Sequence, residues 1–526
     1  MIKRLLFLLL CACSLAAHAA LDAAQVRKLA DDDSTEKVAA IRALVQSADP
    51  DALRVLQAMA DDSLYVAGDK VVIVADDKAF DAASGAAIPM PDSPDSVTVN
   101  NRIRGELAGA LAALRLFDGD PAVRKDSAQK LQTGATPELA PLLARALDKE
   151  SDAGIKALLA TAHAQATLGS PDPAVRLAAV RALADSTSPT IRSQLQALTT
   201  VEGEADEKVR YEAVTAVKAI ESRLAFAENL GRVFSGLSLG SILLLIALGL
   251  AITYGVMGVI NMAHGELLMV GAYSAYAMQS VFRAYFPDAI DWYLPAAVPV
   301  AFLAAALVGV VMERTVIRWL YGRTLETLLA TWGISLVLIQ AARVLFGAQN
   351  VEVSNPSWMS GGIELMPNLM LPWNRIIIIG FALFVLTLVW ALMNRTRLGM
   401  FVRAVTQNRA MAGCVGVPTS RIDTLAFALG AGIAGLGGVA LSQISNVGPD
   451  MGQGYIVDSF MVVVLGGVGQ LAGAVWAALG LGVVSKLLEG WAGAVIAKIV
   501  VLVFIIVFIQ KRPQGLFALK GRFVDN

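Results

Sequence analysis

Three polar side chains interrupt an apolar stretch that lies between two runs long enough to cross a lipid bilayer. The stretch, 254–272, reads YGVMGVINMAHGELLMVGA, and Asn261, His264 and Glu266 stand in it among four glycines. An ionisable side chain at membrane depth is costly to bury, so it marks a functional site by default. The amide, imidazole and carboxyl groups together offer hydrogen-bond donors and acceptors. We therefore predict that this stretch lines the path of a small polar solute.

Glycines also disturb the backbone of this stretch, and a second glycine-rich interruption, LGGVGQLAG, follows at 465–473. Irregular backbone at membrane depth is tolerated only where protein or a water-filled cavity surrounds it. Two interrupted segments, one in each half of a membrane region, indicate the central site of a transporter. For 466–473 alone, close helix packing through small residues is an alternative interpretation. The predicted path residues are Asn261, His264, Gly265, Glu266, Gly258, Gly466, Gly467 and Gly469.

The elements that must hold these residues are membrane helices, which are revealed by windows of about twenty apolar residues. The windows are 234–254, 262–282, 294–312, 325–346, 376–393, 424–442 and 492–509, with an ambiguous block at 455–488. Five glycines between 430 and 438 are assigned to close helix packing, because small residues let two backbones approach each other.

Charged residues distinguish the two sides of the membrane. Arginines gather in the gaps 313–323 and 395–421, whereas the gap 347–372 contains two glutamates and neither lysine nor arginine. Lys and Arg favour the cytoplasmic side, so 347–372 is predicted to be external. Lys511 and Arg512, after the last span, also indicate the cytoplasm. The block 455–488 must therefore make no net crossing, either as a re-entrant pair of short helices or as a tight hairpin.

The two halves of the 526-residue chain differ in composition. Residues 21–228 are rich in Ala, Leu and Asp with regularly spaced charges, whereas 229–526 consists of apolar runs with charges in short gaps. We predict a mainly α fold in which a soluble domain, 21–228, precedes a polytopic membrane domain, 229–526. The formal net charge of −1 gives no basic excess, so nucleic acid is not an expected partner.

The first twenty residues have the layout of a cleaved secretory signal peptide. Two basic residues precede an apolar core, and the small residues AHA follow at 17–19, with cleavage after Ala19 or Ala20. A lipoprotein signal with Cys13 as the lipid-bearing residue is the alternative. Cleavage after the signal leaves one cysteine, Cys414, so no disulfide is expected. The predicted location is the bacterial inner membrane, with 21–228 in the periplasm.

Helix starts recur through the soluble half. Asp120, Asp172 and Asp206 each begin the pattern D-x-x-V-R followed by apolar residues at helical spacing, and a related start occurs at Ser34. Aspartate caps the free amides of a first helical turn, and proline, present after two of these aspartates, suits the first helical position. Second helices between the starts make helix pairs, as in HEAT-like solenoids. Such arrays present an interaction surface.

An insertion at 64–88 breaks this helical pattern. Its β-branched residues flank Gly68-Asp69, and a second turn signal follows at Ser84-Gly85, so we predict a small hairpin or meander. The next segment, MPDSPDS at 90–96, is predicted to be a loop.

Three motifs in the membrane half resemble a known family. YGVMGVINMAHGELLMVGAY at 254–273, VVVLGGVGQLAGAVWAALGLG at 462–482 and KRPQGLF at 511–517 resemble LivH-type permeases, the membrane subunits of branched-chain amino acid and urea ABC importers. The segment 325–351 and the exported extension look more like the urea permeases than the amino acid permeases of this family. The resemblance implies a heteromeric importer with a second permease subunit, two cytoplasmic ATPases and a periplasmic solute-binding protein, and it implies no cofactor.

The chain contains no G-x-x-x-x-G-K-[ST] phosphate-binding loop, so ATP must be hydrolysed by separate subunits and the chain itself is not expected to be an enzyme. The basic loop 396–421 looks like the coupling helix of LivH-type permeases: apolar and polar residues have helical spacing until Gly413, Gly416 and Pro418 end it. A basic loop that only sets topology is the alternative. The predicted ATPase-contact residues are Arg403, Ala404, Gln407, Asn408, Met411, Ala412 and Gly416.

Four functions are weighed. The first is the translocation subunit of an importer for urea or a related small amide, and a branched-chain amino acid permease is its alternative. An amino acid would need a partner for its carboxylate, and 255–271 contains no Lys or Arg, although a partner subunit could supply one. A passive channel would not need the long basic loop. A membrane-anchored scaffold would not need polar, broken segments.

Overall fold

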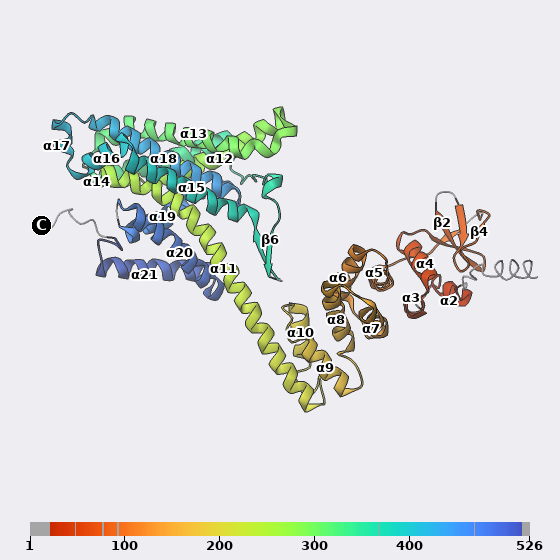
Figure 1. Cartoon of the computed structure of the whole chain (residues 1–526). Coiled ribbons are helices and arrows are strands. Elements are labelled where there is room, and N and C mark those ends of the chain that lie inside the picture. The colour runs from red at the N-terminus through yellow and green to blue at the C-terminus, as the bar shows by residue number, and fades with distance from the viewer. Residues whose placement is uncertain are drawn as a thin grey trace, which may run out of the picture. The chain divides into compact units, whose positions relative to one another are not determined.

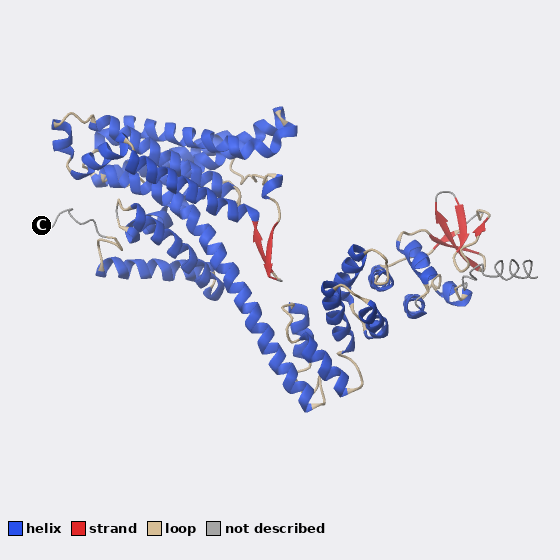
Figure 2. Cartoon of the chain, viewed as in Figure 1, coloured by secondary structure: helices blue, strands red, loops and turns tan. Residues whose placement is uncertain are grey.

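The computed structural model describes residues 21–47, 49–75, 78–91, 94–366, 368–467 and 469–517. The predicted signal peptide, 1–20, lies outside the described residues. The chain divides into two compact units between Leu224 and Ala225. Helix α11, Glu207–Met257, runs through this division without interruption. Figures 1 and 2 show that helices dominate both units and that strands are confined to one part of each.

Helices follow one another along the first unit, and four begin where the sequence predicted, one at Ser34 and three directly after aspartate caps. Asp120 accepts a hydrogen bond from the Ala122 amide at 2.8 Å, and Asp172 accepts one from the Ala174 amide at 2.9 Å. Asp206 likewise caps the start of α11. The helices are α2 Ala23–Lys28, α3 Ser34–Ser47, α4 Pro50–Ala60, α5 Asn101–Arg115, α6 Pro121–Gly134, η1 Pro137–Leu139, α7 Ala140–Lys149, α8 Ala153–Thr167, α9 Pro173–Leu183 and α10 Pro189–Ala197.

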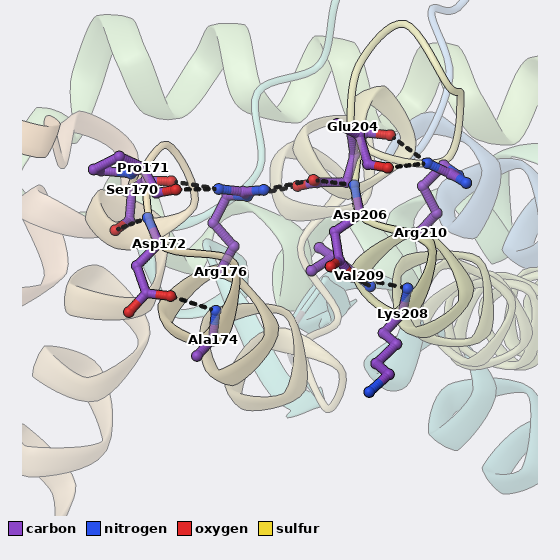
Figure 3. Close-up of polar contacts among 11 residues, drawn as sticks. Ser170, Pro171, Asp172, Ala174, Arg176, Glu204, Asp206, Lys208, Val209 and Arg210 are labelled. Carbon is purple, nitrogen blue, oxygen red and sulfur yellow. Dashed lines mark hydrogen bonds and ion pairs between the residues drawn. The ribbon is translucent and has the colours of Figure 1, made fainter.

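The arginine of each D-x-x-V-R pattern ties neighbouring loops together, as Figure 3 shows for Arg176. Its guanidinium donates to the carbonyl of Ser170 at 2.8 Å and to both carboxylate oxygens of Glu204 at 2.6 Å. Arg210 in turn donates to the Glu204 carbonyl at 2.7 Å. Arg124 repeats the arrangement one pattern earlier, because it donates to the buried carboxylate of Glu150 at 2.8 Å. Charge-assisted hydrogen bonds thus join the loop before α6 to the loop before α8, and the loop before α9 to the loop before α11.

The insertion in the first unit is a five-stranded antiparallel sheet with the order β4-β3-β2-β1-β5. Its strands are β1 Leu64–Ala67, β2 Lys70–Ala75, β3 Lys78–Asp81, β4 Ala87–Ile88 and β5 Asp95–Ser96. The predicted meander is confirmed for β1 to β4. The prediction of a loop at 90–96 was wrong for its last two residues, which form β5 and pair with the free edge of β1. Two residues suffice for this pairing, and they carry no side-chain pattern typical of a strand.

The second unit is a bundle of long helices with one β-hairpin. Its elements are α12 His264–Tyr285, η2 Pro287–Trp292, α13 Tyr293–Thr315, η3 Ile317–Leu320, α14 Thr324–Phe346, η4 Ser357–Met359, β6 Gly362–Met366, β7 Leu369–Pro372, α15 Trp373–Arg395, α16 Arg397–Gln407, α17 Arg409–Cys414, α18 Thr419–Ser442, α19 Met451–Gly466, α20 Leu471–Ala492 and α21 Ala494–Lys511.

Among the described residues, seven helices are long and apolar enough to cross a membrane. They are α11, the continuous stretch of η2 and α13, α14, α15, α18, α20 and α21. The predicted span 262–282 is a helix, α12, but Glu266, Gln279 and Arg283 make it more polar than these seven. The ambiguous block 455–488 lies within α19 and α20, two helices that follow each other closely in the chain. Only α20 is among the seven, so the absence of a net crossing in this block stays a prediction.

Helix α18 forms the centre of the second unit, since most of its side chains are buried. Its glycines meet the backbones of neighbouring helices: Gly430 packs against Gly249 of α11, and Gly435 packs against Gly271 of α12. A Cβ atom on Gly249, Gly271 or Gly430 would collide with the opposite backbone, and one on Gly435 would collide with Ala301 and Ala305 of α13. The predicted assignment of the α18 glycines to close helix packing is therefore confirmed.

Candidate functional site

The chain between α11 and α12, residues 258–263, is irregular and starts at Gly258, whose φ of +66° favours glycine. It leads back into the bundle, because His264 at the start of α12 contacts Ile246 of α11. Ile246 precedes the end of α11 by eleven residues, or about 16 Å along a helix axis. Helix α12 therefore begins beside α11 well before the end of α11, and residues 258–263 span the distance between these two points.

His264 is fully buried, and its two ring nitrogens have different surroundings. Nε2 lies 3.0 Å from the Ile246 carbonyl oxygen, which can only accept a hydrogen bond, so Nε2 carries the proton. Nδ1 then presents a lone pair and has no partner among the described residues. One nitrogen of the ring fixes its position, and the other remains free to accept a hydrogen bond.

Asn261 and Glu266 are also buried, and each has one unpaired atom. The Asn261 oxygen accepts from the Ala263 amide at 3.0 Å, but its Nδ2 has no partner in the described structure. Glu266 Oε2 is likewise unpaired. Buried polar atoms without partners are uncommon, so each needs an explanation such as a bound solute or water. The segment thus presents one unpaired donor, Asn261 Nδ2, and two unpaired acceptors, His264 Nδ1 and Glu266 Oε2.

Helix α14 supplies a polar wall that sequence reasoning missed. Thr327, Thr331 and Ser335 are buried at four-residue intervals along it. Thr331 Oγ1 accepts from the Met262 amide at 3.1 Å and so supports the irregular segment, while Ser335 is buried one turn further along the same helix. The signal in the sequence was the regular spacing of hydroxyls in an apolar helix, which places them on one face.

The second interruption meets the first at one end of the bundle. In α11, Gly236 packs against Val483 of α20, and Gly240 packs against Ala478 of the same helix. Further along α11, Gly255 lies close to Gly469, because a Cβ atom on Gly255 would be 3.2 Å from the Gly469 Cα. Helices α11 and α20 therefore run antiparallel, which brings the end of α11 to the turn between α19 and α20.

The C-terminal motif closes over the same turn. The Leu516 amide donates to the Leu465 carbonyl at 2.8 Å, and Gly467, with a φ of +99°, would place a Cβ 2.6 Å from the Phe517 carbonyl oxygen. Only glycine combines this backbone conformation with such a close approach. The three motifs singled out in the sequence thus include residues that meet around one turn.

The predicted path residues therefore fall into two groups. Asn261, His264, Gly265 and Glu266 lie together at the start of α12, where Gly265 packs directly against Gly452 of α19. Gly467 and Gly469 lie at the turn that Gly255 reaches. Two predicted residues remain, and one of them, Gly258, lies three residues after Gly255. The other, Gly466, packs against Gly473, so close packing of small residues accounts for it.

The basic loop differs in two respects from its prediction. The single helix predicted through 403–412 is two helices, α16 and α17, because the Asn408 side chain accepts from the Met411 amide at 2.9 Å and starts a new helix. Ala412 is only 4% exposed, whereas Met411 is 60% exposed. Of the predicted contact residues, Arg403, Gln407, Asn408, Met411 and Gly416 are exposed, Ala404 is half-buried and Ala412 faces the core.

Arg409 joins α17 to the bundle through contacts that the sequence did not indicate. Its guanidinium forms an ion pair with the buried Asp423 near the start of α18, and it lies 4.0 Å from the ring centre of Tyr321, in the connection between α13 and α14. Both contacts depend on how α17 turns back toward α18, which residue spacing does not reveal.

Comparison with known proteins places this chain in a family. The family described as "Branched-chain amino acid transport system / permease component" matches residues 232–509, more than half of the chain. The chain belongs to this family. The matched region contains both glycine interruptions and the loop of α16 and α17, whereas residues before 232 lie outside it.

Relatives in this family are transport permeases rather than enzymes. The chain is 30% identical over 299 residues to the high-affinity branched-chain amino acid transport system permease protein LivH of Escherichia coli, covering 55% of this chain and 96% of LivH. It is 28% identical over 293 residues to BraD of Pseudomonas aeruginosa, covering 55% and 95%. The chain is also 31% identical over 100 residues to the ribose import permease protein RbsC of Escherichia coli, and this match covers 18% of this chain and 31% of RbsC. This chain is thus a membrane permease component of the LivH and BraD type.

Proposed function

We propose that this permease is the translocation subunit of an ATP-driven importer for urea or a related small amide, and that the solute passes the segment 258–266. The unpaired atoms carry the proposal. Urea has one carbonyl oxygen and two amino groups, and the segment offers one donor, Asn261 Nδ2, with two acceptors, His264 Nδ1 and Glu266 Oε2. The resemblance of 325–351 to the urea permease subunit UrtB supports the same solute class.

A branched-chain amino acid is the second candidate solute. The relatives LivH and BraD are named for branched-chain amino acid transport. In addition, α12 begins inside the bundle without a side-chain cap, and a helix N-terminus favours a carboxylate. In this proposal the Glu266 carboxylate would face the ammonium group of the amino acid.

The proposed importer has further parts. It comprises a second permease subunit, two cytoplasmic ATPases and a periplasmic solute-binding protein, in the bacterial inner membrane. Residues 21–228 form its periplasmic domain, a HEAT-like array whose task is to bind another protein. The helix pairs and the similar arginine contacts of Arg124 and Arg176 support an array, and the signal layout of residues 1–20 supports export.

The proposed contact with an ATPase is the exposed surface of α16 and α17 around Gln407 and Met411. Arg409 would pass a movement of α17 to α18 through its ion pair with Asp423. Helix α18 packs through Gly430 against Gly249, which itself lies beside His264. A continuous chain of contacts therefore joins the proposed ATPase surface to the proposed path.

Competition for uptake tests the solute. Vesicles containing the complete complex, its binding protein and internal ATP are given radiolabelled urea, with unlabelled acetamide or leucine as competitor. Inhibition by acetamide and none by leucine is expected. Uptake of labelled leucine that urea does not inhibit would favour the second candidate.

A further inference from the structure

A groove of about 580 Å³ opens at the end of the second unit opposite α16. Its walls are the part of α11 around Arg232, Asn368 with strand β7, the start of α15 and the end of α20. All of these residues belong to the second unit. Helix α15 begins beside the groove and leads at its other end into α16.

Three cations and two carboxylates line the groove. Arg232 pairs with Glu228 and also donates to Asn229, and Lys486 pairs with Glu489 at 2.6 Å. The Arg375 guanidinium has no hydrogen bond or ion pair to any described side chain or carbonyl. The two pairs are neutral, so the groove carries one uncompensated positive charge.

These cations lie at the end where a membrane protein usually has few. Lys and Arg concentrate on the cytoplasmic side of membrane proteins, and here the arginine-rich loop of α16 and α17 is at the other end of α15. A local role for the groove cations explains their presence better than topology does. Gly490 also belongs to this arrangement, because a Cβ there would collide with the Arg232 guanidinium.

The groove is flanked by residues typical of the boundary between lipid and water. Trp373 is 38% exposed at the start of α15, and Trp491 is 89% exposed near the end of α20. Exposed tryptophans favour the level of lipid headgroups. Val495 and Ile496, which follow on α21, expose an apolar surface suited to acyl chains. The acyl chains of a lipid whose headgroup lies in the groove would therefore contact apolar side chains.

We propose that this groove binds the headgroup of an anionic phospholipid, with the phosphate on Arg375. A guanidinium binds phosphate through two parallel hydrogen bonds, and Lys486 and Arg232 retain donors that can reach the same oxygens. A phosphate diester carries a single negative charge, which matches the one uncompensated positive charge. Hydroxyls of a phosphatidylglycerol headgroup can donate to Glu228 and Glu489, whereas a zwitterionic lipid would leave the Arg375 charge unbalanced.

Native mass spectrometry of the purified, lipid-depleted complex tests this binding. The complex is incubated with equal amounts of phosphatidylglycerol and phosphatidylethanolamine, and retained lipid is counted. One phosphatidylglycerol per copy of this chain is expected. Arg375→Gln should lower its retention about fivefold, the effect of one cation near a lipid headgroup. Arg314→Gln, which removes an exposed arginine at the cytoplasmic end of α13, is the matched control and should leave retention unchanged.

Three outcomes would overturn the proposal. Equal retention of both lipids, or equal retention by Arg375→Gln and Arg314→Gln, would mean that no specific site exists. Displacement of the lipid by inorganic phosphate at equal concentration would identify a site for a soluble anion instead. Because lipid retention is measured without transport, a failure here is distinguishable from a failure of the proposed transport function.

Discussion

At the scale of residues, the two nitrogens of His264 separate a structural role from a role in transport. Nε2 donates to the Ile246 carbonyl and Nδ1 is free. Glutamine can place a donor near Nε2 but offers nothing at Nδ1, whereas asparagine places an oxygen near Nδ1 and loses the bond to Ile246. His264→Gln therefore removes only the free acceptor at Nδ1, and His264→Asn removes only the hydrogen bond to Ile246.

We expect His264→Gln to assemble normally and to lower solute uptake by up to about tenfold, the effect of one lost hydrogen bond of roughly 1.4 kcal/mol. His264→Asn should instead reduce the amount of assembled complex. Uptake per assembled complex and the yield of complex are measured together in vesicles. Normal uptake by His264→Gln would mean that His264 serves only to hold α12 against α11.

Sequence reasoning found the residues whose chemistry is rare at membrane depth. Asn261, His264 and Glu266 were evident because polar groups in an apolar stretch are exceptional. Thr331 and Ser335 were missed because hydroxyls are common in membrane helices and bond to their own backbone. The ion pair of Arg409 and Asp423 was missed because it depends on the turn after α17.

At the scale of elements, the division of the basic loop into α16 and α17 decides which side chains can meet an ATPase. Met411 is exposed and Ala412 is buried. We expect Met411→Trp to leave assembly intact and to lower uptake per ATP hydrolysed at least fivefold, because bulk at the contact prevents docking. Ala412→Trp should reduce assembled complex, since adding atoms to a packed core costs about 1–3 kcal/mol.

The coupling ratio is measured from uptake and phosphate release in the same vesicles. An unchanged ratio for Met411→Trp in an assembled complex would leave the loop with a role in topology only. Glycines and prolines indicated where this loop turns, but not that Asn408 would start a second helix, because a capping side chain is recognised only once its helix is known.

The arginine contacts in the first unit predict a loss of stability in acid. Hydrogen bonds from Arg124 and from the backbone lower the pKa of Glu150 to about 2, and Arg176 lowers the pKa of Glu204. A carboxylate with a lowered pKa stabilises the fold above its ordinary pKa near 4.5 and loses this contribution as the pH falls toward 2. The first unit should therefore lose stability between about pH 5 and pH 2.

Glu150→Gln should remove much of this pH dependence and lower the stability of the first unit at pH 7, because it removes the negative charge that the Arg124 guanidinium pairs with. Hydrogen exchange of α6 and α8 in the intact chain measures both effects. Glu207→Gln is the control, since this exposed carboxyl group has no ion pair in the described structure. Equal stability of the two variants at pH 7 would contradict the proposed importance of the arginine contacts.

At the scale of the whole molecule, the native cysteine reports sidedness. Cys414 is exposed at the end of α17, which we propose to be cytoplasmic. A cysteine introduced at the exposed Gln129 of α6 should react with an impermeant thiol reagent in intact spheroplasts, whereas Cys414 should react only after lysis. Ser127→Cys is the control, because Ser127 is buried and should be unreactive on either side. Reaction of Cys414 in intact spheroplasts would reverse the proposed topology.

The organisation of the chain was largely evident from composition and periodicity. Apolar windows found six of the seven helices that are long and apolar enough to cross a membrane, and aspartate caps found the starts of α6, α9 and α11. The meeting of the two interruptions at Gly255 and Gly469 was not evident, because it depends on the antiparallel packing of α11 and α20. Contacts between distant helices follow from packing rather than from local pattern.

The central claim is that ATP drives a small amide past Glu266. It is tested most directly by uptake of radiolabelled urea into vesicles that contain the complete complex and its binding protein, with and without ATP. The account predicts uptake that requires ATP, that falls at least tenfold in Glu266→Gln, and that is unchanged in Glu364→Gln, a control in the exposed hairpin of β6 and β7. Urea uptake that is independent of ATP, or undiminished in Glu266→Gln, would contradict it.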